Sequence, residues 1–157
     1  MDWITQEIAI GNCDDARRFD KLREAGIGGI LSLTGWPNGA NNVHGVDWRC
    51  VELIDGFGNP VDQLREAVWQ LHDLTERGRV LVHCMEGVSR SPLVVASYLA
   101  DKAARPFADC LQEISNLRKW VALQPGLMEL RVAYEAAFQL HERVGRPSTR
   151  AVQGTIG

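Results

Sequence analysis

The stretch Leu81-Val-His-Cys-Met-Glu-Gly-Val-Ser-Arg-Ser91 decides how this 157-residue chain is interpreted. It opens inside the apolar run of residues 80–83, which predicts a short buried strand. It leads into the apolar run of residues 91–100, which predicts a helix with Pro92 near its first turn. The loop between them therefore lies where backbone N–H groups and the positive end of a helix converge. Such a loop is suited to binding an oxyanion.

Three residues of this loop have distinct chemical uses. Cys84 would lie in the positive field of the helix N-terminus and of Arg90, where a thiol gives up its proton and becomes a nucleophile. The planar guanidinium of Arg90 can bind two oxygens of one phosphate, and Gly87 lets the backbone approach a ligand without a Cβ clash. Taken singly, neither residue indicates catalysis. Cys84 could equally well be a buried apolar side chain, and Arg90 could equally well be a solvated surface residue. The combination of residue types, spacing and setting favours a catalytic phosphate-binding loop.

This run resembles the signature of the cysteine-dependent phosphatases, and within them of the dual-specificity family. The family pattern is His-Cys-x-x-Gly-x-Ser-Arg-Ser after a valine-rich strand, and residues 83–91 fit it at every defined position. Residues 7–12, 16–34 and 125–135 are similar to its opening strand, its first helix with the next strand, and its last helix. One departure is Leu123-Gln124, where the family often carries Pro-Asn.

The resemblance implies a phosphomonoester hydrolase that works through a phosphocysteine intermediate, with Cys84, Arg90 and Ser91 as catalytic residues. The most direct expectation is a protein phosphatase acting on phosphotyrosine and on phosphoserine or phosphothreonine, with no cofactor and no metal ion. His83 is expected to steady the loop by hydrogen bonds. The phosphate-binding loop is expected to consist of Met85, Glu86, Gly87, Val88, Ser89 and Arg90.

Such a reaction also needs a proton donor for the leaving oxygen, and Asp55 is the best candidate. It follows a predicted strand in a glycine-punctuated loop, where an aspartate is more often a turn residue bonded to its own backbone. The resemblance favours the catalytic role, because the family's general acid also lies on the loop after this strand. Asp47, Asp62 and Asp73 are weaker candidates, at a strand start, in the first turn of a helix and in mid-helix.

Strands and helices alternate along the chain, which predicts an α/β fold, and the resemblance implies the three-layer architecture of the phosphatases. We expect a central, mostly parallel sheet of about five strands with helices on both faces. Further strands are predicted at residues 27–33 and 46–53, and residues 34–45 form a polar loop. Helices are predicted at residues 14–25 with Asp14 or Asp15 as the cap, and at residues 61–77, 107–119 and 125–144.

Composition is that of a single globular domain, with 45% hydrophobic and 24% charged residues. We expect one catalytic domain over residues 1–145 and a short disordered tail over residues 146–157. The net charge of −3 predicts no general attraction to nucleic acid or to anionic membranes. No apolar run reaches transmembrane length, no secretory signal is recognised, and a catalytic thiolate suits the reducing cytoplasm.

The substrate stays open at this level. Met85, Glu86 and Val88 are uncharged or acidic, which argues against polyanionic substrates. The alternative to a protein phosphatase is a phosphatase of a phosphoinositide, a phosphosugar or an RNA 5′ end. A non-catalytic phosphate-binding module and a thiol redox enzyme are less favoured, because Cys84, Arg90 and Asp55 occur together and no second cysteine lies near Cys84 in the sequence.

Three residues outside the motif receive weaker expectations. Cys50 is expected to be a core cysteine, with a protective disulfide to Cys84 as the alternative. Trp36 and His44 lie on the polar loop that is expected to border the site, where a role in substrate recognition is plausible.

Overall fold

The computed structural model describes residues 1–35 and 44–145. Its centre is a five-stranded sheet with the strand order β1-β2-β5-β3-β4. The strands are β1 (Asp2–Trp3), β2 (Ile8–Gly11), β3 (Ile27–Ser32), β4 (Asp47–Cys50) and β5 (Arg79–His83). β2, β5, β3 and β4 run parallel, and β1 pairs antiparallel with β2. The predicted mostly parallel sheet is confirmed.

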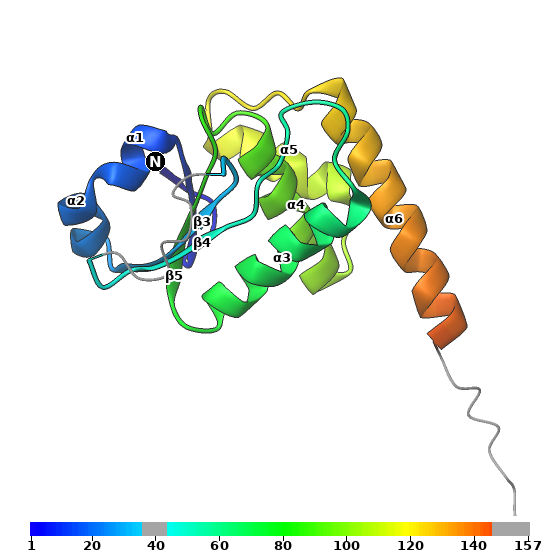
Figure 1. Ribbon diagram of the computed structural model, residues 1–157, viewed down its shortest axis with the longest axis horizontal. Coiled ribbons are helices and arrows are strands. Elements are labelled where there is room, and N and C mark those ends of the chain that lie inside the picture. The colour runs from blue at the N-terminus through cyan, green and yellow to red at the C-terminus, as the bar shows by residue number, and fades with distance from the viewer. Residues whose placement is uncertain (36–43, 146–157) are drawn as a thin grey trace, which may run out of the picture.

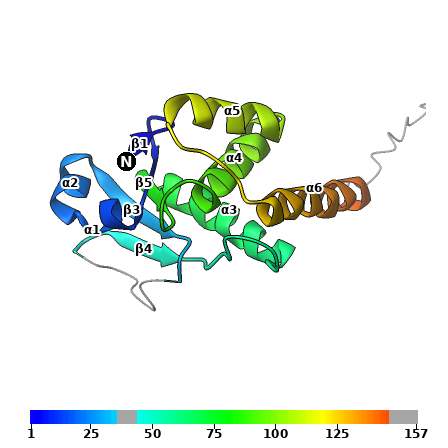
Figure 2. The same ribbon diagram turned by 90° about the horizontal axis from the view of Figure 1, so that it is seen from above.

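Helices cover both faces of the sheet, as predicted, but unequally (Figures 1 and 2). They are α1 (Cys13–Arg17), α2 (Phe19–Glu24), α3 (Val61–Thr75), α4 (Arg90–Ala103), α5 (Phe107–Leu117) and α6 (Pro125–Gly145). The short α1 and α2 cover one face, and the longer helices lie on the other. There α3 and α4 contact the strands, while α5 packs on α4 and α6 packs on α3 and α4.

Alternating residues of the central strand β5 supply the two cores. Val80 and Val82 are fully buried on the side of α3 and α4, whereas Leu81 is fully buried on the side of α1 and α2. Such two-sided burial is what an apolar run in a parallel sheet predicts, because successive side chains point to opposite faces. The strand that precedes the loop of residues 84–89 is therefore fixed from both sides.

The helix predicted at residues 14–25 is wrong in detail, since it consists of the two short helices α1 and α2. Its cap is Asn12, not Asp14 or Asp15: the Asn12 side chain accepts from the Asp15 N–H, and the Asp15 carboxylate accepts from the Asn12 N–H. The chain breaks at Arg18, which has non-helical angles (φ −89°, ψ 67°). In one continuous helix Ala16 and Leu22 would lie roughly 240° apart around the axis, so the break lets both enter the same core.

The edges of the sheet also differ from expectation. The strand predicted at residues 46–53 is regular only over β4. After β4 the Val51 N–H still donates to the Ser32 carbonyl oxygen, and the Leu53 N–H donates to the Leu33 carbonyl oxygen. β1 is too short to show an alternating pattern, so the sequence did not indicate it. Cys50 ends the edge strand β4 and is exposed, so its assignment as a core cysteine is wrong.

The parallel strands end together at one edge of the sheet. Gly11 of β2 is level with His83 of β5, His83 with Ser32 of β3, and Ser32 with Cys50 of β4. The segments that follow these strands therefore meet at one edge. In parallel α/β sheets this carboxyl edge is where ligands bind.

Some predictions fall outside the described part of the chain. These are the tail of residues 146–157 and most of the polar loop of residues 34–45, including Trp36. Among the helices within residues 1–35 and 44–145, none combines the length and the apolar character that crossing a membrane requires.

The core on the α3 side predicts a clear difference between two leucines. Leu71 of α3 is fully buried, while Leu117 at the end of α5 is 53% exposed. Leu71→Ala should lower the free energy of unfolding by about 2–5 kcal/mol, because it removes a buried side chain and leaves a cavity. The same truncation at Leu117 should cost no more than about 1 kcal/mol. Urea unfolding followed by circular dichroism measures both, and equal losses would contradict the described core.

Candidate active site

Cys84 lies directly after β5, at the carboxyl edge of the sheet, and is 2% exposed. The Gly87 N–H donates a hydrogen bond to its Sγ at 3.2 Å. The chain enters α4 at Arg90, so the sulfur and the loop both lie at the positive end of a 14-residue helix. This end of the helix is a favourable place for an anionic ligand.

The carbonyl groups of residues 84–88 are all drawn away from the loop centre. Each accepts a hydrogen bond from a donor outside these five residues. The donors are His83 Nδ1 to Cys84 (3.1 Å), Cys13 N–H to Met85 (3.1 Å), Arg118 Nη2 to Glu86 (3.1 Å), Arg118 Nε to Gly87 (2.7 Å) and Ala122 N–H to Val88 (3.0 Å).

The direction of the carbonyl groups determines the direction of the N–H groups. In a trans peptide the C=O and the following N–H point to opposite sides. The peptide between Glu86 and Gly87 shows this, because its oxygen bonds Arg118 on the outside while its N–H bonds the Cys84 sulfur on the inside. Repeated along the loop, this arrangement gives a ring of inward N–H donors around the space above Cys84, which is a binding site for an oxyanion.

Arg118 is a functional residue that the sequence reading missed. It follows the end of α5, and its side chain is only 11% exposed. Besides the Glu86 and Gly87 carbonyl groups, its guanidinium binds the Ile10 carbonyl oxygen at 3.2 Å and the Asp2 carboxylate. Its partners are main-chain groups distant in sequence, so no local motif reveals its role as a positioning residue.

The sequence predicts that Gly87 lets the backbone approach a ligand; in the structure the groups that approach it closely are β2 and Arg118. Its φ of +69° lies in the left-handed region, and a Cβ there would sit 2.5 Å from both the Gly11 carbonyl oxygen and Arg118 Nη2. The close approach to β2 and to Arg118 is what allows the loop to be held from behind. A side chain at this position would disturb both contacts.

Arg90 is the first residue of α4 and is held by two carbonyl groups. Its Nη1 donates to Leu33 at 3.3 Å and to Leu53 at 3.1 Å. Its Nε is buried and has no hydrogen-bond partner within residues 1–35 and 44–145. The Nε–Nη2 side of the guanidinium is the edge that can meet two oxygens of one anion. The phosphate-binding role of Arg90 stays a prediction, and the unpartnered Nε is the atom that would serve it.

His83 supports the loop as predicted. It is fully buried, and its Nδ1 lies 3.1 Å from the Cys84 carbonyl oxygen, which can only accept, so Nδ1 carries the proton. Burial, more than the nearby Arg90 charge, lowers the pKa of His83. The imidazole is therefore neutral near pH 7, and the positive field at Cys84 comes from Arg90 and α4.

The two serines of the motif have different surroundings. The Ser89 hydroxyl oxygen accepts from the Gln124 N–H at 3.1 Å, which links the phosphate loop to the segment before α6. The donor is a backbone group, and it lies in the Leu123-Gln124 segment that differs from the family pattern. Ser91 is fully buried in the first turn of α4, and its hydroxyl has no partner among the described residues.

Asp55 lies on the loop between β4 and α3 and is exposed. Asn59 braces this loop: its side chain accepts from the Ile54 N–H at 2.8 Å and donates to the Ile54 carbonyl oxygen at 2.8 Å. Gly126, at the start of α6, packs so closely that a Cβ would lie 2.4 Å from the Phe57 nitrogen. The Leu53 carbonyl group, two residues before Asp55, binds Arg90. The structure therefore connects the loop of Asp55 to Arg90 and to α6.

Two of the three competing carboxylates form ion pairs. Asp47 and Asp73 both pair with Arg49, at 2.8 and 2.7 Å. The hydrogen bond from Arg49 holds the pKa of Asp73 below its ordinary value. Asp62 is an exposed residue in the first turn of α3. Asp47 and Asp73 are thus held in ion pairs, whereas Asp55 and Asp62 are exposed, and the catalytic role of Asp55 stays a prediction.

The remaining predicted residues lie at the rim or beyond it. Met85 is 51% exposed, Glu86 is exposed and Val88 is half-buried. Cys50 lies on β4, which is separated from β5 by β3. At the usual strand spacing, β4 and β5 are roughly 10 Å apart. A disulfide to Cys84 would need the backbone to move, because bridged Cα atoms lie within about 7 Å. The His44 ring lies 4.5 Å from the Phe19 ring, and its role in recognition stays a prediction.

Residues 10–136 match the family model described as "Dual specificity phosphatase, catalytic domain". A probable dual specificity protein phosphatase of Dictyostelium discoideum is 29% identical over 145 residues, which is 90% of this chain and 66% of that protein. Dual specificity protein phosphatase 22-A of Danio rerio is 28% identical over 82% of this chain and 62% of its own length. The chain therefore spans less than two thirds of each of these relatives.

Solved structures agree in fold. Human DUSP28 superposes with a TM-score of 0.79 at 21% identity, covering 90% of this chain and 99% of that one. A mouse putative dual specificity phosphatase complexed with zinc tungstate gives a TM-score of 0.79 at 22% identity, covering 90% and 89%. The predicted phosphatase-type architecture is confirmed.

The site predicts that Arg118→Lys weakens phosphate binding although it keeps the charge. Lysine lacks the rigid planar fork through which Nη2 and Nε hold the Glu86 and Gly87 carbonyl groups at fixed positions, so the inward N–H groups lose their common direction. The dissociation constant for inorganic phosphate should rise about 10- to 100-fold, the value of one or two charge-assisted hydrogen bonds. Calorimetric titration measures it, with Arg105→Lys, at an exposed pair with Glu113, as the matched control. Equal affinities in the two variants would contradict the role of Arg118.

Proposed function

Because the chain belongs to the dual specificity phosphatase family, we propose that it hydrolyses phosphomonoesters through a phosphocysteine at Cys84. The observation that carries the proposal is the loop of residues 84–88, whose carbonyl groups point outward and leave N–H donors around the sulfur. A nucleophile at the centre of an oxyanion site suits attack on a phosphate group.

In the first step, the substrate phosphate binds to the loop N–H groups and to the Nε–Nη2 edge of Arg90. The Cys84 thiolate attacks phosphorus, so a sulfur–phosphorus bond forms while the bond to the leaving oxygen breaks. Asp55 donates its proton to that oxygen, and the alcohol or phenol departs. The loop and Arg90 stabilise the charge on the equatorial oxygens, where most of the catalysis of phosphoryl transfer lies.

In the second step, water attacks the phosphocysteine. The Asp55 carboxylate accepts a proton from the water, the sulfur–phosphorus bond breaks, and inorganic phosphate leaves. We propose that the Ser91 hydroxyl donates a hydrogen bond to the Cys84 sulfur when the sulfur regains its negative charge. This assignment rests on the position of Ser91 in the first turn of α4 and on its buried hydroxyl, which has no partner in the described ranges.

For the substrate we propose phosphotyrosine and phosphoserine or phosphothreonine in proteins. The rim supports this, because the exposed Met85 and Glu86 bring no positive charge for the additional phosphates of a phosphoinositide or an RNA 5′ end. Relatives named as dual specificity protein phosphatases agree with it. A reactive thiolate further favours a reducing compartment, and we place the enzyme in the cytoplasm.

The proposed nucleophile leads to the first test. Cys84→Ser should lower turnover of p-nitrophenyl phosphate, assayed with EDTA present, by at least about 10³-fold, as removal of a catalytic nucleophile does. Inorganic phosphate should still bind, because the loop N–H groups and Arg90 remain. Cys50→Ser, at an exposed cysteine, is the control and should keep full activity. A wild-type protein that binds phosphate without turnover would identify a binding module instead.

The proposed general acid leads to a test with two leaving groups. Asp55→Asn should lower turnover by about 10²–10⁴-fold on phosphoserine peptides, whose alkoxide leaving group needs a proton. The loss should be smaller on an aryl phosphate with an acidic phenol, which can depart without one. Asp62→Asn is the matched control and should leave turnover of both substrates unaltered. Equal losses on the two substrates in Asp55→Asn would show that Asp55 is only a turn residue.

A further inference from the structure

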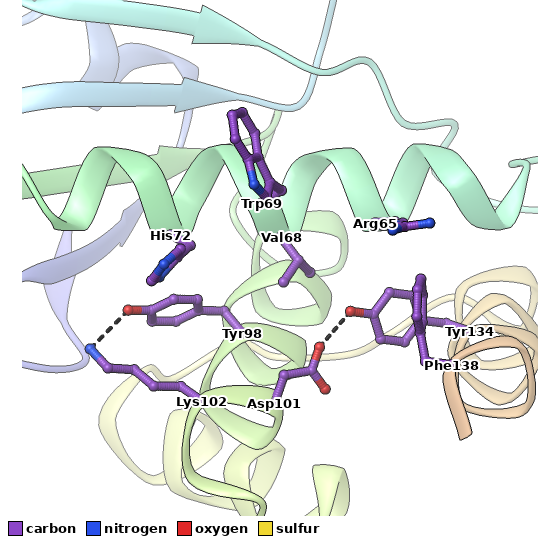
Figure 3. A pocket seen from close by; sticks show the side chains of 9 residues that line it. All are labelled: Arg65, Val68, Trp69, His72, Tyr98, Asp101, Lys102, Tyr134 and Phe138. Carbon is purple, nitrogen blue, oxygen red and sulfur yellow. Dashed lines mark hydrogen bonds between the residues drawn. The ribbon is translucent and has the colours of Figure 1, made fainter. Parts of the chain in front are cut away.

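A hollow of about 460 Å³ lies between α3, α4 and α6 (Figure 3). Its walls are apolar and aromatic, and they are built by Val68 and Trp69 of α3, Tyr98 of α4, and Tyr134 and Phe138 of α6. The volume falls within the range of about 300–1,000 Å³ that is typical of small-molecule sites. We call this hollow the three-helix pocket.

The three-helix pocket is separate from the phosphate loop. Lys102, which lines it, lies near the far end of α4 from Arg90. At a rise of about 1.5 Å per residue the two are roughly 18 Å apart along the helix axis. None of the residues that build the phosphate site lines the pocket. Its ligand chemistry must therefore be argued from its own side chains.

Two cations stand at opposite ends of the apolar walls. The Arg65 guanidinium lies over the Phe138 ring, 5.0 Å from its centre, and Lys102 Nζ lies 3.0 Å from the Tyr98 hydroxyl. Neither forms an ion pair with a carboxylate in the part of the chain that the structure describes. Glu7 and Glu76 act on the Lys102 charge only from beyond ion-pair distance, so an anion entering the pocket would meet two cations that the described carboxylates do not contact directly.

The pocket is also lined by one carboxylate, Asp101, which interacts with neighbouring side chains of α6. It accepts a hydrogen bond from the Tyr134 hydroxyl, and Arg131 Nη1 lies 3.8 Å from its other oxygen. Burial, and after it the hydrogen bond to Asp101, raises the pKa of Tyr134, so this hydroxyl keeps its proton at neutral pH. Arg131 is shared with Glu135, to which it pairs at 2.9 Å, so Asp101 keeps part of its charge. The lining still carries two cations, Arg65 and Lys102, against the single carboxylate of Asp101, and the net charge presented to a ligand is positive.

Polar donors gather at one end of the pocket. Figure 3 shows His72 and Lys102 beside the Tyr98 hydroxyl. That hydroxyl also lies 3.1 Å from Thr75 Oγ1, so it is held from two sides. An ammonium has three donors, and its bond to Tyr98 uses one of them. Two donors of Lys102 stay available to a carboxylate.

We propose that the three-helix pocket binds amphipathic carboxylates, with an aliphatic or aromatic body on the aromatic walls and the carboxylate at Lys102. A cationic amphiphile is disfavoured, because Arg65 and Lys102 already lie on the rings of Phe138 and Tyr98 that would attract it. This site does not depend on the proposed phosphatase activity.

The test compares two probes with the same tail and opposite charge, decanoate and decyltrimethylammonium, below their micelle concentrations. Tryptophan fluorescence of the whole protein is recorded in saturating inorganic phosphate, which occupies the phosphate loop. Decanoate should bind roughly tenfold more tightly than the cation. Its signal should vanish in Trp69→Phe, because Trp69 lines the pocket and is 57% exposed.

A charge-reversal pair locates the carboxylate. Arg65→Glu with Lys102→Glu should weaken decanoate binding roughly tenfold or more, whereas Lys21→Glu with Arg23→Glu on α2 makes the same change in net charge and should leave binding unaltered. Calorimetric titration gives the affinities even if the fluorescence signal is small. Competition by phosphate, equal binding of both probes, or equal losses in both double variants would each overturn the proposal.

Discussion

The hydrogen bonds that draw the carbonyl groups of residues 84–88 outward are the constraint on which the rest of the site depends. A loop by itself has no inherent reason to point its N–H groups to one centre. Here a side-chain imidazole and two backbone N–H groups each hold one carbonyl group from behind, and a guanidinium holds two. Because each peptide is planar, holding the oxygen outside places the next N–H inside. The nucleophile then lies among donors that need no rearrangement when an anion binds.

The parallel sheet makes these bonds possible. Gly11, His83, Ser32 and Cys50 end their strands in register, so the segments after them meet at one edge. The segment after β2 supplies the Cys13 N–H, and those after β3 and β4 supply the Leu33 and Leu53 carbonyl groups that bind Arg90. The loop of Asp55 continues from Leu53 and rests on the start of α6 at Gly126. Cysteine, arginine and candidate acid are thus connected through the strand ends.

The sequence predicted the features that depend on residues close together in the chain and missed those that depend on residues far apart. Cys84, Gly87 and Arg90 were identified because strand, turn and helix signals within a few residues specify the loop locally. Arg118 was missed, since its partners at residues 2, 10, 86 and 87 are distant in the chain and three of them are backbone carbonyl groups. The break at Arg18 was missed for a related reason: local propensity favours one helix, whereas two helices let Ala16 and Leu22 share a core.

The α/β alternation and the motif that indicates an anion-binding loop, with Cys84 as its candidate nucleophile, follow from side-chain periodicity and from residue types over short spacings. Folding adds which donors hold the loop, that His83 is neutral, that Asp47 and Asp73 are paired with Arg49, and that Cys50 lies at an exposed edge. It also decided the three-helix pocket, whose walls come from three separate helices. The physical reason is that burial, hydrogen bonding and electrostatic pairing belong to contacts between distant segments, which exist only once the chain has folded.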